Sequence, residues 1–101
     1  MYASVLRFES NTKDLEEIEA LFEKSLIPEM RLQNGYEGCY FLRASKTQGL
    51  AVTLWESKDA LEANNQNEAF STILRSFVED LGAEVRMKPY QVRYADHQMH
   101  P

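Results

Sequence analysis

The 101-residue sequence is poor in the residues that build cross-links and metal centres. It holds one cysteine, Cys39, and two histidines, His97 and His100, both close to the C-terminal end. A single cysteine excludes a disulfide within the chain, and a zinc site needs three or four converging ligands, which no cluster in the sequence supplies. We therefore expect no metal. We interpret Cys39, which lies among alternating apolar residues, as a small buried side chain rather than a reactive nucleophile.

Long apolar runs and an excess of basic charge are also missing. No stretch approaches the roughly 20 apolar residues of a membrane-spanning helix, and residues 1–10 lack the basic start and apolar stretch of a signal peptide. We therefore expect a cytoplasmic protein with no membrane partner. The net charge of −5 disfavours a nucleic-acid partner, because phosphate binding depends on clustered lysine and arginine.

What is present indicates one folded domain. With 44% hydrophobic and 27% charged residues, the composition is that of an ordinary globular protein. We place a single domain at residues 1–95 and a C-terminal tail at residues 96–101. His97 and His100 lie in that tail, where a solvated segment is the expected state, so a ligand or catalytic role is the less favoured interpretation.

The first third of the sequence predicts a strand followed by an amphipathic helix. Residues 2–8 are few and rich in aromatic and branched side chains, which favours a strand. Residues 15–30 carry apolar side chains at helical spacing, after Asn11, Thr12 and Asp14, which suit a helix N-terminus. Pro28 falls inside this pattern and deletes a backbone hydrogen bond, so we expect a kink or a break shortly before it.

The middle of the sequence predicts a hairpin and then a helical region. Residues 36–44 and 49–55 both favour strands and are separated by polar, turn-forming residues, so a hairpin is the simplest link. A short helix capped by Ser57 follows. After a break among the polar residues 64–67, a second helical pattern continues as far as Gly82.

A last strand completes the order. Residues 84–94 alternate polar and apolar side chains, and Pro89 within them marks an edge position, a bulge or a division of the strand. The order strand, helix, strand, strand, helix, strand predicts an α+β domain of the ferredoxin-like βαββαβ type with an antiparallel sheet. Both helical regions should then cover one face of that sheet.

The opposite face of the sheet indicates that a second copy of the chain packs against it. Both central strands are apolar on both sides, since Tyr40 and Leu42 alternate with Cys39 and Phe41, and residues 50–55 show the same pattern. An open apolar face would be an aggregation risk. Packing it against the same face of a second copy removes it from water, and a twofold dimer is the commonest closed symmetry. We therefore expect a homodimer in the form of a dimeric α/β barrel.

Three short motifs surround the hairpin. W-E-S stands at residues 55–57, A-L-E-A follows at residues 60–63, and N-G-Y-E-G lies upstream at residues 34–38. Together they resemble the antibiotic biosynthesis monooxygenase family, whose members show a Gly-containing entry to strand two, a W-E-S step and an A-L-x-A helix start. The resemblance covers nearly the whole chain in element order. It implies the dimeric barrel and a cofactor-independent oxygenation of an electron-rich aromatic such as a hydroquinone or an anthrone.

The sequence departs from this family at functional positions. Many relatives carry a histidine soon after the A-L-x-A step and another before the last helix, where this sequence has Asn64 and Ala69. The haem-degrading branch uses a tryptophan and an iron-ligating histidine in this region and an asparagine in strand one. Here the corresponding positions hold Asn64, Leu74 and Leu6, so haem degradation of the usual kind is not expected.

The resemblance directs attention to five side chains. Asn64 occupies a position where relatives carry a functional histidine, and together with Arg43 it is predicted to donate hydrogen bonds to a substrate oxygen. Trp55, Tyr40 and Phe70 are predicted to form the apolar walls that bind the substrate. Three of them have a plainer interpretation: Asn64 as a helix-end cap, Arg43 as a surface residue at a strand end, and Trp55 as a core side chain.

Two functions therefore stand open. The first is a cofactor-free monooxygenase acting on a small quinol- or anthrone-like aromatic, although no interior histidine is available as a general base. The second is a non-catalytic dimeric barrel that binds a small apolar ligand or none. A pocket between sheet and helices bordered by Asn64 and Trp55 would favour the first, and a cavity filled by Phe70, Phe41 and Tyr40 the second.

Overall fold

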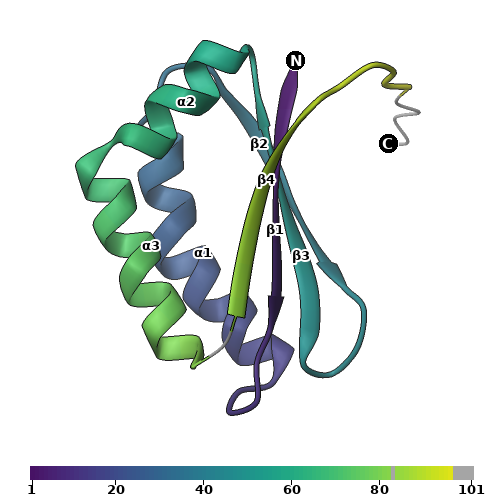
Figure 1. Ribbon diagram of the computed structural model, residues 1–101, viewed down its shortest axis with the longest axis vertical. Coiled ribbons are helices and arrows are strands. Elements are labelled where there is room, and N and C mark those ends of the chain that lie inside the picture. Colours follow the sequence, from purple (N-terminus) through teal and green to yellow (C-terminus); the bar gives the residue numbers. More distant parts are fainter. Residues whose placement is uncertain (83, 97–101) are drawn as a thin grey trace.

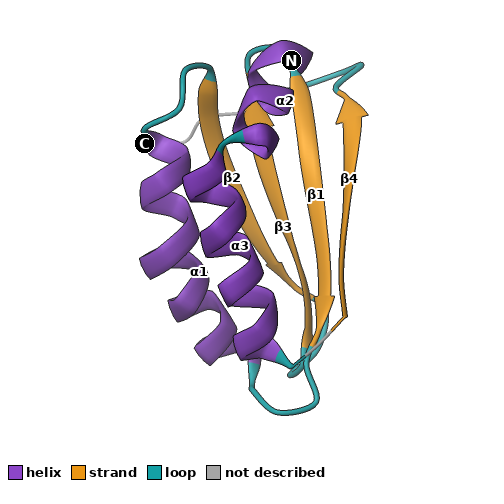
Figure 2. Cartoon of the chain, turned by 60° about the vertical axis from the view of Figure 1, so that its left-hand side comes forward, coloured by secondary structure: helices purple, strands orange, loops and turns teal. Residues whose placement is uncertain are grey.

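A computed structural model describes residues 1–82 and 84–96 of the chain. Four strands form one antiparallel sheet in the order β2-β3-β1-β4, and the helices cover one of its faces (Figures 1 and 2). This is the predicted ferredoxin-like architecture, with the second helical region divided in two. No helix in the described part of the chain is long and apolar enough to cross a membrane. The elements are β1 (Tyr2–Glu9), α1 (Leu15–Arg31), β2 (Tyr36–Arg43), β3 (Gln48–Trp55), α2 (Lys58–Gln66), α3 (Glu68–Leu81) and β4 (Glu84–Gln91).

Helix α1 continues through Pro28, so the predicted break is wrong, while the alternative, a kink, stays a prediction. The helix ends only at Arg31. The side chain of Pro28 is exposed, which places the carbonyl group that lost its donor on the solvent side, where water can satisfy it. Leu26 and Met30, on the opposite side, are each 1% exposed and hold the last turn in the core.

Of the residues predicted to cap α1, Thr12 instead joins the segment before the helix to the end of α3, together with Ser10. Asp14 occupies the N-cap position but its side chain makes no capping hydrogen bond. The hydroxyl groups of Thr12 and Ser10 donate to the backbone carbonyl of Leu81, over 3.0 and 2.9 Å. Together they satisfy a carbonyl at the C-terminus of α3, where the helix itself supplies no donor.

The division between α2 and α3 follows from two N-caps. Ser57 Oγ accepts a hydrogen bond from the backbone N–H of Ala60, which starts α2 as predicted. Asn67 has an extended backbone, and its Oδ1 accepts from the N–H of Phe70, which starts α3 directly after α2. At the end of α3, Gly82 adopts a left-handed conformation with φ of 55°, which confirms the predicted stop.

The register assigns each strand residue to one face of the sheet. Ala51, Thr53 and Trp55 on β3 point toward the helices, and Leu50, Val52 and Leu54 alternate with them toward the open face. On β2 the open face includes Tyr40 and Leu42, which are 53% and 46% exposed. The central strands are therefore apolar on both sides, as predicted.

Strand β4 is an edge strand, which explains how it tolerates Pro89. It ends at Gln91, three residues earlier than predicted. The backbone N–H of Val92 still donates to the carbonyl of Met1, but β1 begins at Tyr2, so the rest of the segment has no strand to pair with. Tyr94 beyond it is 84% exposed.

The motifs around the hairpin meet at one corner of the fold. Gly35 has φ of 86°, and a Cβ atom built on it would lie 2.6 Å from the Cβ of Ala60. The N–H of Glu56 donates to the carbonyl of Gly35 over 2.7 Å, and the rings of Tyr36 and Trp55 pack edge to face with centroids 5.3 Å apart. The N-G-Y, W-E-S and A-L-E-A motifs thus hold the entry to β2 against the start of α2.

Candidate functional site

A small cavity lies between the sheet and the helices. Its volume is about 10 Å³, which is close to the space that one water molecule requires. Three elements contribute polar side chains to it: Ser4 from β1, Thr53 from β3, and Asn64 with Asn65 from α2. The rest of the lining is apolar: Leu6, Phe22, Leu26, Met30, Phe70 and Met87.

Two buried polar atoms at this cavity have no partner within the described residues. They are Ser4 Oγ and Asn64 Oδ1, and the two residues are 3% and 2% exposed. A buried polar group left without a hydrogen bond costs about 1–3 kcal/mol. Two such atoms on the wall of one cavity therefore indicate a place where an added polar group is stabilised.

The third polar side chain is already used by the protein. The indole N–H of Trp55 donates to Thr53 Oγ1 over 2.9 Å, and the Thr53 hydroxyl donates to the carbonyl of Ser4 over 3.5 Å. Trp55 is fully buried and does not line the cavity. The indole fixes the Thr53 side chain, so Ser4 and Asn64 are the groups left to bind something else.

The structure brings only two of the five predicted site residues together. Asn64 and Phe70 both line the cavity, and Trp55 lies behind its wall. Tyr40 pairs with Val52 on the open face, on the other side of the sheet. Arg43 is exposed at the end of β2, opposite Gly49, and does not reach the cavity.

Ionisable groups are missing from the cavity lining, which changes the chemistry it can support. None of its lining residues is acidic, basic, cysteine or tyrosine. Burial raises the pKa of the Cys39 thiol to about 11, and burial with the nearby Cys39 raises the pKa of Tyr36. Both groups stay protonated near neutrality. His97 and His100 lie outside the described residues, and the described ones include no cluster of three possible metal ligands.

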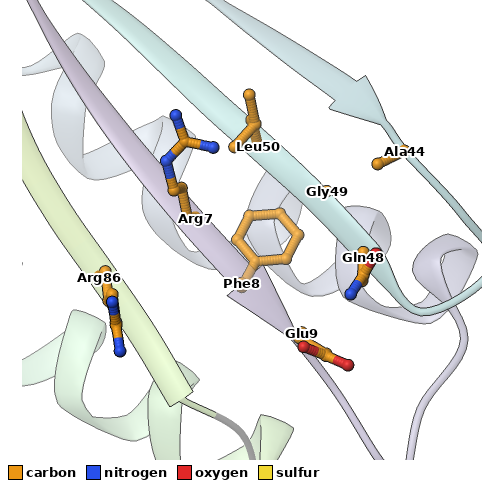
Figure 3. Close-up of a pocket in the computed structure, with 8 residues that line it drawn as sticks. All are labelled: Arg7, Phe8, Glu9, Ala44, Gln48, Gly49, Leu50 and Arg86. Atoms are coloured by element: carbon orange, nitrogen blue, oxygen red, sulfur yellow. The ribbon is translucent and has the colours of Figure 1, made fainter.

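A larger hollow lies on the open face, away from Asn64. Figure 3 shows it with the helices behind the sheet; its volume is about 450 Å³. Arg7 and Arg86 are cross-strand partners there, and Glu9 and Gln48 lie at the strand ends. This hollow belongs to the face that we expect a second copy to cover, and none of the predicted site residues lines it.

Sequence reasoning missed Ser4, Thr53 and Met87. A signal was present for two of them. Ser4 alternates in phase with Leu6 and Phe8, and Thr53 is in phase with the apolar Trp55, so each is a polar residue on the core face of a strand. Met87 could not be found in this way, because it is not a polar residue on a core face. It lines the cavity and is still 41% exposed, since the helices leave β4 partly uncovered.

Comparisons with known proteins identify the fold. No protein-family model and no curated protein sequence matches the chain. Among solved structures, a variant of SnoaB, a cofactor-independent oxygenase from Streptomyces nogalater, superposes with a TM-score of 0.79 at 18% identity, covering 93% of this chain and 94% of that one.

Two further structures match over nearly their whole length. A putative antibiotic biosynthesis monooxygenase from Deinococcus radiodurans superposes with a TM-score of 0.73 at 13% identity, covering 99% of this chain and all of the other. A second, from Nitrosomonas europaea, gives 0.69 at 16% identity, with 93% and 100% covered. The resemblance read from the motifs is thus confirmed at the level of architecture: the chain has the fold of the antibiotic biosynthesis monooxygenase structures.

Proposed function

We propose that the chain is a cofactor-independent oxygenase of a small hydroxylated aromatic compound, which binds in the cavity beside Asn64. The observation that carries the proposal is the pair of buried, unpartnered atoms, Ser4 Oγ and Asn64 Oδ1. The fold supports it, because SnoaB, which has the same architecture, is a cofactor-independent oxygenase. Fold likeness alone does not carry chemistry.

The reaction requires the protein only to hold the substrate anion by hydrogen bonds and to exclude water. The substrate loses the proton of its hydroxyl group, the resulting anion transfers an electron to O₂, and oxygen adds to a ring carbon; conversion of a CH₂ group to a carbonyl then releases one water. The Ser4 hydroxyl supplies a neutral donor to the anionic oxygen, and Asn64 Oδ1 accepts a hydrogen bond from a hydroxyl group of the bound substrate. The apolar side chains exclude water while the anion reacts.

The proton has to leave without a basic side chain of the cavity. No lining residue is ionisable, and Arg43, the second predicted donor, is exposed outside it. A substrate whose own hydroxyl is acidic meets this requirement, because it releases its proton to water. Phenols with ordinary pKa values near 10 do not.

Binding requires the cavity to enlarge. A ligand pocket typically measures about 300–1,000 Å³, against the 10 Å³ present. Met30 and Met87 line the cavity, and unbranched methionine side chains rearrange easily. Met87 is 41% exposed, so its side chain lies between the cavity and solvent, and its movement would open an entrance beside β4.

The proposal includes a homodimer formed through the open face of the sheet. Tyr40, Leu42 and Tyr90 expose 53%, 46% and 42% of their surface on that side. Leu50 and Val52 lie beside them on β3. Face-to-face packing of two such sheets would close the barrel and leave the cavity on the outer, helix-covered side of each sheet.

The second candidate function is a non-catalytic barrel that binds a small apolar ligand or none. The small cavity volume favours it, as does Phe70 in the cavity wall. The two candidates differ in turnover. A binding protein would not consume oxygen with any quinol.

Oxygen consumption by the purified protein tests the proposal. The protein is mixed with a panel of hydroquinones and anthrones of graded acidity, without metal or flavin. We expect uptake above the spontaneous rate for the acidic members, and loss of that uptake in Asn64→Ala. Gln66→Ala, an exposed position on the same helix, is the matched control and should keep full activity. A flat trace across the panel would favour the binding protein.

A further inference from the structure

Ser4 and Asn64 reach the same cavity from different layers of the fold. Ser4 lies on β1, with its side chain on the core face between Tyr2 and Leu6, and Asn64 lies on α2. Each residue is at least 97% buried, and neither Ser4 Oγ nor Asn64 Oδ1 has a protein partner among the described residues, so the two do not bond to each other. The other polar residues that line the cavity are Thr53 and Asn65.

We propose that Ser4 and Asn64 form one hydroxyl-binding subsite, in which a single oxygen atom bridges Ser4 Oγ and Asn64 Oδ1. A water molecule fills this position in the resting protein, and the hydroxyl group of a ligand replaces it on binding. The subsite belongs to the cavity of the proposed function, but its existence does not depend on oxygenation.

The two atoms impose a chemical requirement on the ligand. Asn64 Oδ1 only accepts hydrogen bonds, whereas the Ser4 hydroxyl both donates and accepts. An oxygen that bridges them must therefore donate to Asn64 and can accept from Ser4. A hydroxyl group or water does both, while an ether or carbonyl oxygen has no proton and leaves Asn64 Oδ1 unpartnered. The subsite thus prefers an alcohol or phenol to the corresponding ether or ketone.

The cavity also favours the reduced form of a redox pair. Oxidation of a hydroquinone to a quinone replaces hydroxyl oxygens by carbonyl oxygens, which can accept from Ser4 but cannot donate to Asn64. Asn64 Oδ1 would then be buried without a hydrogen-bond donor, and a site of this kind binds a ligand that lacks the donor much more weakly. A substrate with a hydroxyl group binds and its carbonyl product is released.

A double-mutant cycle tests whether one oxygen bridges the two side chains. Ser4→Ala removes a single oxygen, and Asn64→Leu replaces the amide by an apolar side chain of similar size. If a bridging oxygen is bound, each change lowers the melting temperature, and the double variant loses less than the sum of the two. If Ser4 Oγ is simply unpartnered, Ser4→Ala raises the melting temperature and the two effects add, which would overturn the proposal.

Ser10→Ala is the matched control. Its hydroxyl is equally buried but is fully used, donating to Leu81 and accepting from the backbone N–H groups of Thr12 and Lys13. It should lower the melting temperature in every background and add to Asn64→Leu. Non-additivity with Ser10→Ala would show that the cycle reports a general loss of packing, and would remove the support for a shared oxygen.

Phenol and anisole, which differ by the proton on the oxygen and a methyl group, test the ligand chemistry. At matched millimolar concentrations, phenol should raise the melting temperature of the unmodified protein several-fold more than anisole, and Asn64→Leu should abolish the difference. Equal shifts, or no shift with phenol, would overturn the hydroxyl requirement. Discrimination between the two without oxygen uptake from any quinol would retain the subsite and refute the oxygenase instead.

Discussion

A charged residue placed in the middle of the open face should dissociate the proposed dimer. Val52 lies on the central strand β3, between Val5 on β1 and Tyr40 on β2. The chain exposes 6908 Å², about 1,000 Å² more than compact monomers of 11.7 kDa normally do. Residues 92–96, which project from the sheet, contribute to this excess (Figure 1). An ordinary dimer interface covers about 800 Å² per partner.

The size of the effect follows from the symmetry. In a twofold interface every substitution occurs twice, so Val52→Arg introduces two guanidinium groups. An uncompensated buried charge costs about 3–5 kcal/mol, and a long side chain that reaches toward solvent lowers this to about 2 kcal/mol for each copy. The sum of about 4 kcal/mol weakens the dimer roughly a thousandfold.

Sedimentation equilibrium over a wide concentration range measures this change. Val52→Arg should shift the monomer–dimer transition by about three orders of magnitude in concentration, with an unchanged circular dichroism spectrum. Thr72→Arg, at an exposed position of α3, is the control and should dimerise like the parent. A parent chain that is monomeric at high concentration, or a Val52→Arg variant with the parent's affinity, would refute the interface.

Two further predictions concern the corner motif and the thiol. Gly35→Ala should lower the free energy of unfolding by about 2–4 kcal/mol, from the left-handed backbone and the overlap with Ala60. In urea denaturation Gly82→Ala should lose less, because Gly82 is also left-handed (φ 55°) but the nearest atom to its added Cβ lies 3.5 Å away. Iodoacetamide should modify Cys39 slowly near neutral pH, with a rate that rises toward pH 11, since burial raises the pKa of the thiol to about 11. Because the folded state keeps the proton, the same shift makes stability fall as pH rises from 9 toward 11; a midpoint near 8.5 in the alkylation rate would contradict the burial.

The fold could be predicted because its signals are local. Alternation identified both faces of β3, and the N-cap of α2 at Ser57 was visible as a short polar residue before a helical pattern. The break expected at Pro28 was wrong because the effect of a proline depends on which side of α1 meets solvent, and only the tertiary structure decides that. The end of β4 depends on where β1 begins, which is a property of the partner strand.

The candidate site was less predictable than the fold, and a β-bulge in β2 is one reason that Tyr40 was wrongly placed in it. Tyr36 pairs with Trp55, but the next pair is Gly38 with Leu54, so β2 uses two residues where β3 uses one. This shift places Cys39 and Phe41, rather than Tyr40, on the face of Trp55. Without the bulge, the register of the Tyr36–Trp55 pair would set Tyr40 opposite Ala51. Tyr40 would then lie on the face of Trp55, because a one-residue slip exchanges the two faces.

The cavity itself predicts how any turnover should depend on pH. An apolar environment disfavours a charged ligand. All of the residues that line the cavity, including Ser4 and Asn64, have neutral side chains. The protein therefore contributes no titrating group near neutrality, and the ionised fraction of the substrate sets the rate. Across a series of quinols and anthrones, the midpoint of the kcat/KM profile should move with the pKa of each substrate. A midpoint that stays fixed while the substrate changes would identify a base belonging to the protein, and the histidines His97 and His100, outside the described residues, would be the first to replace.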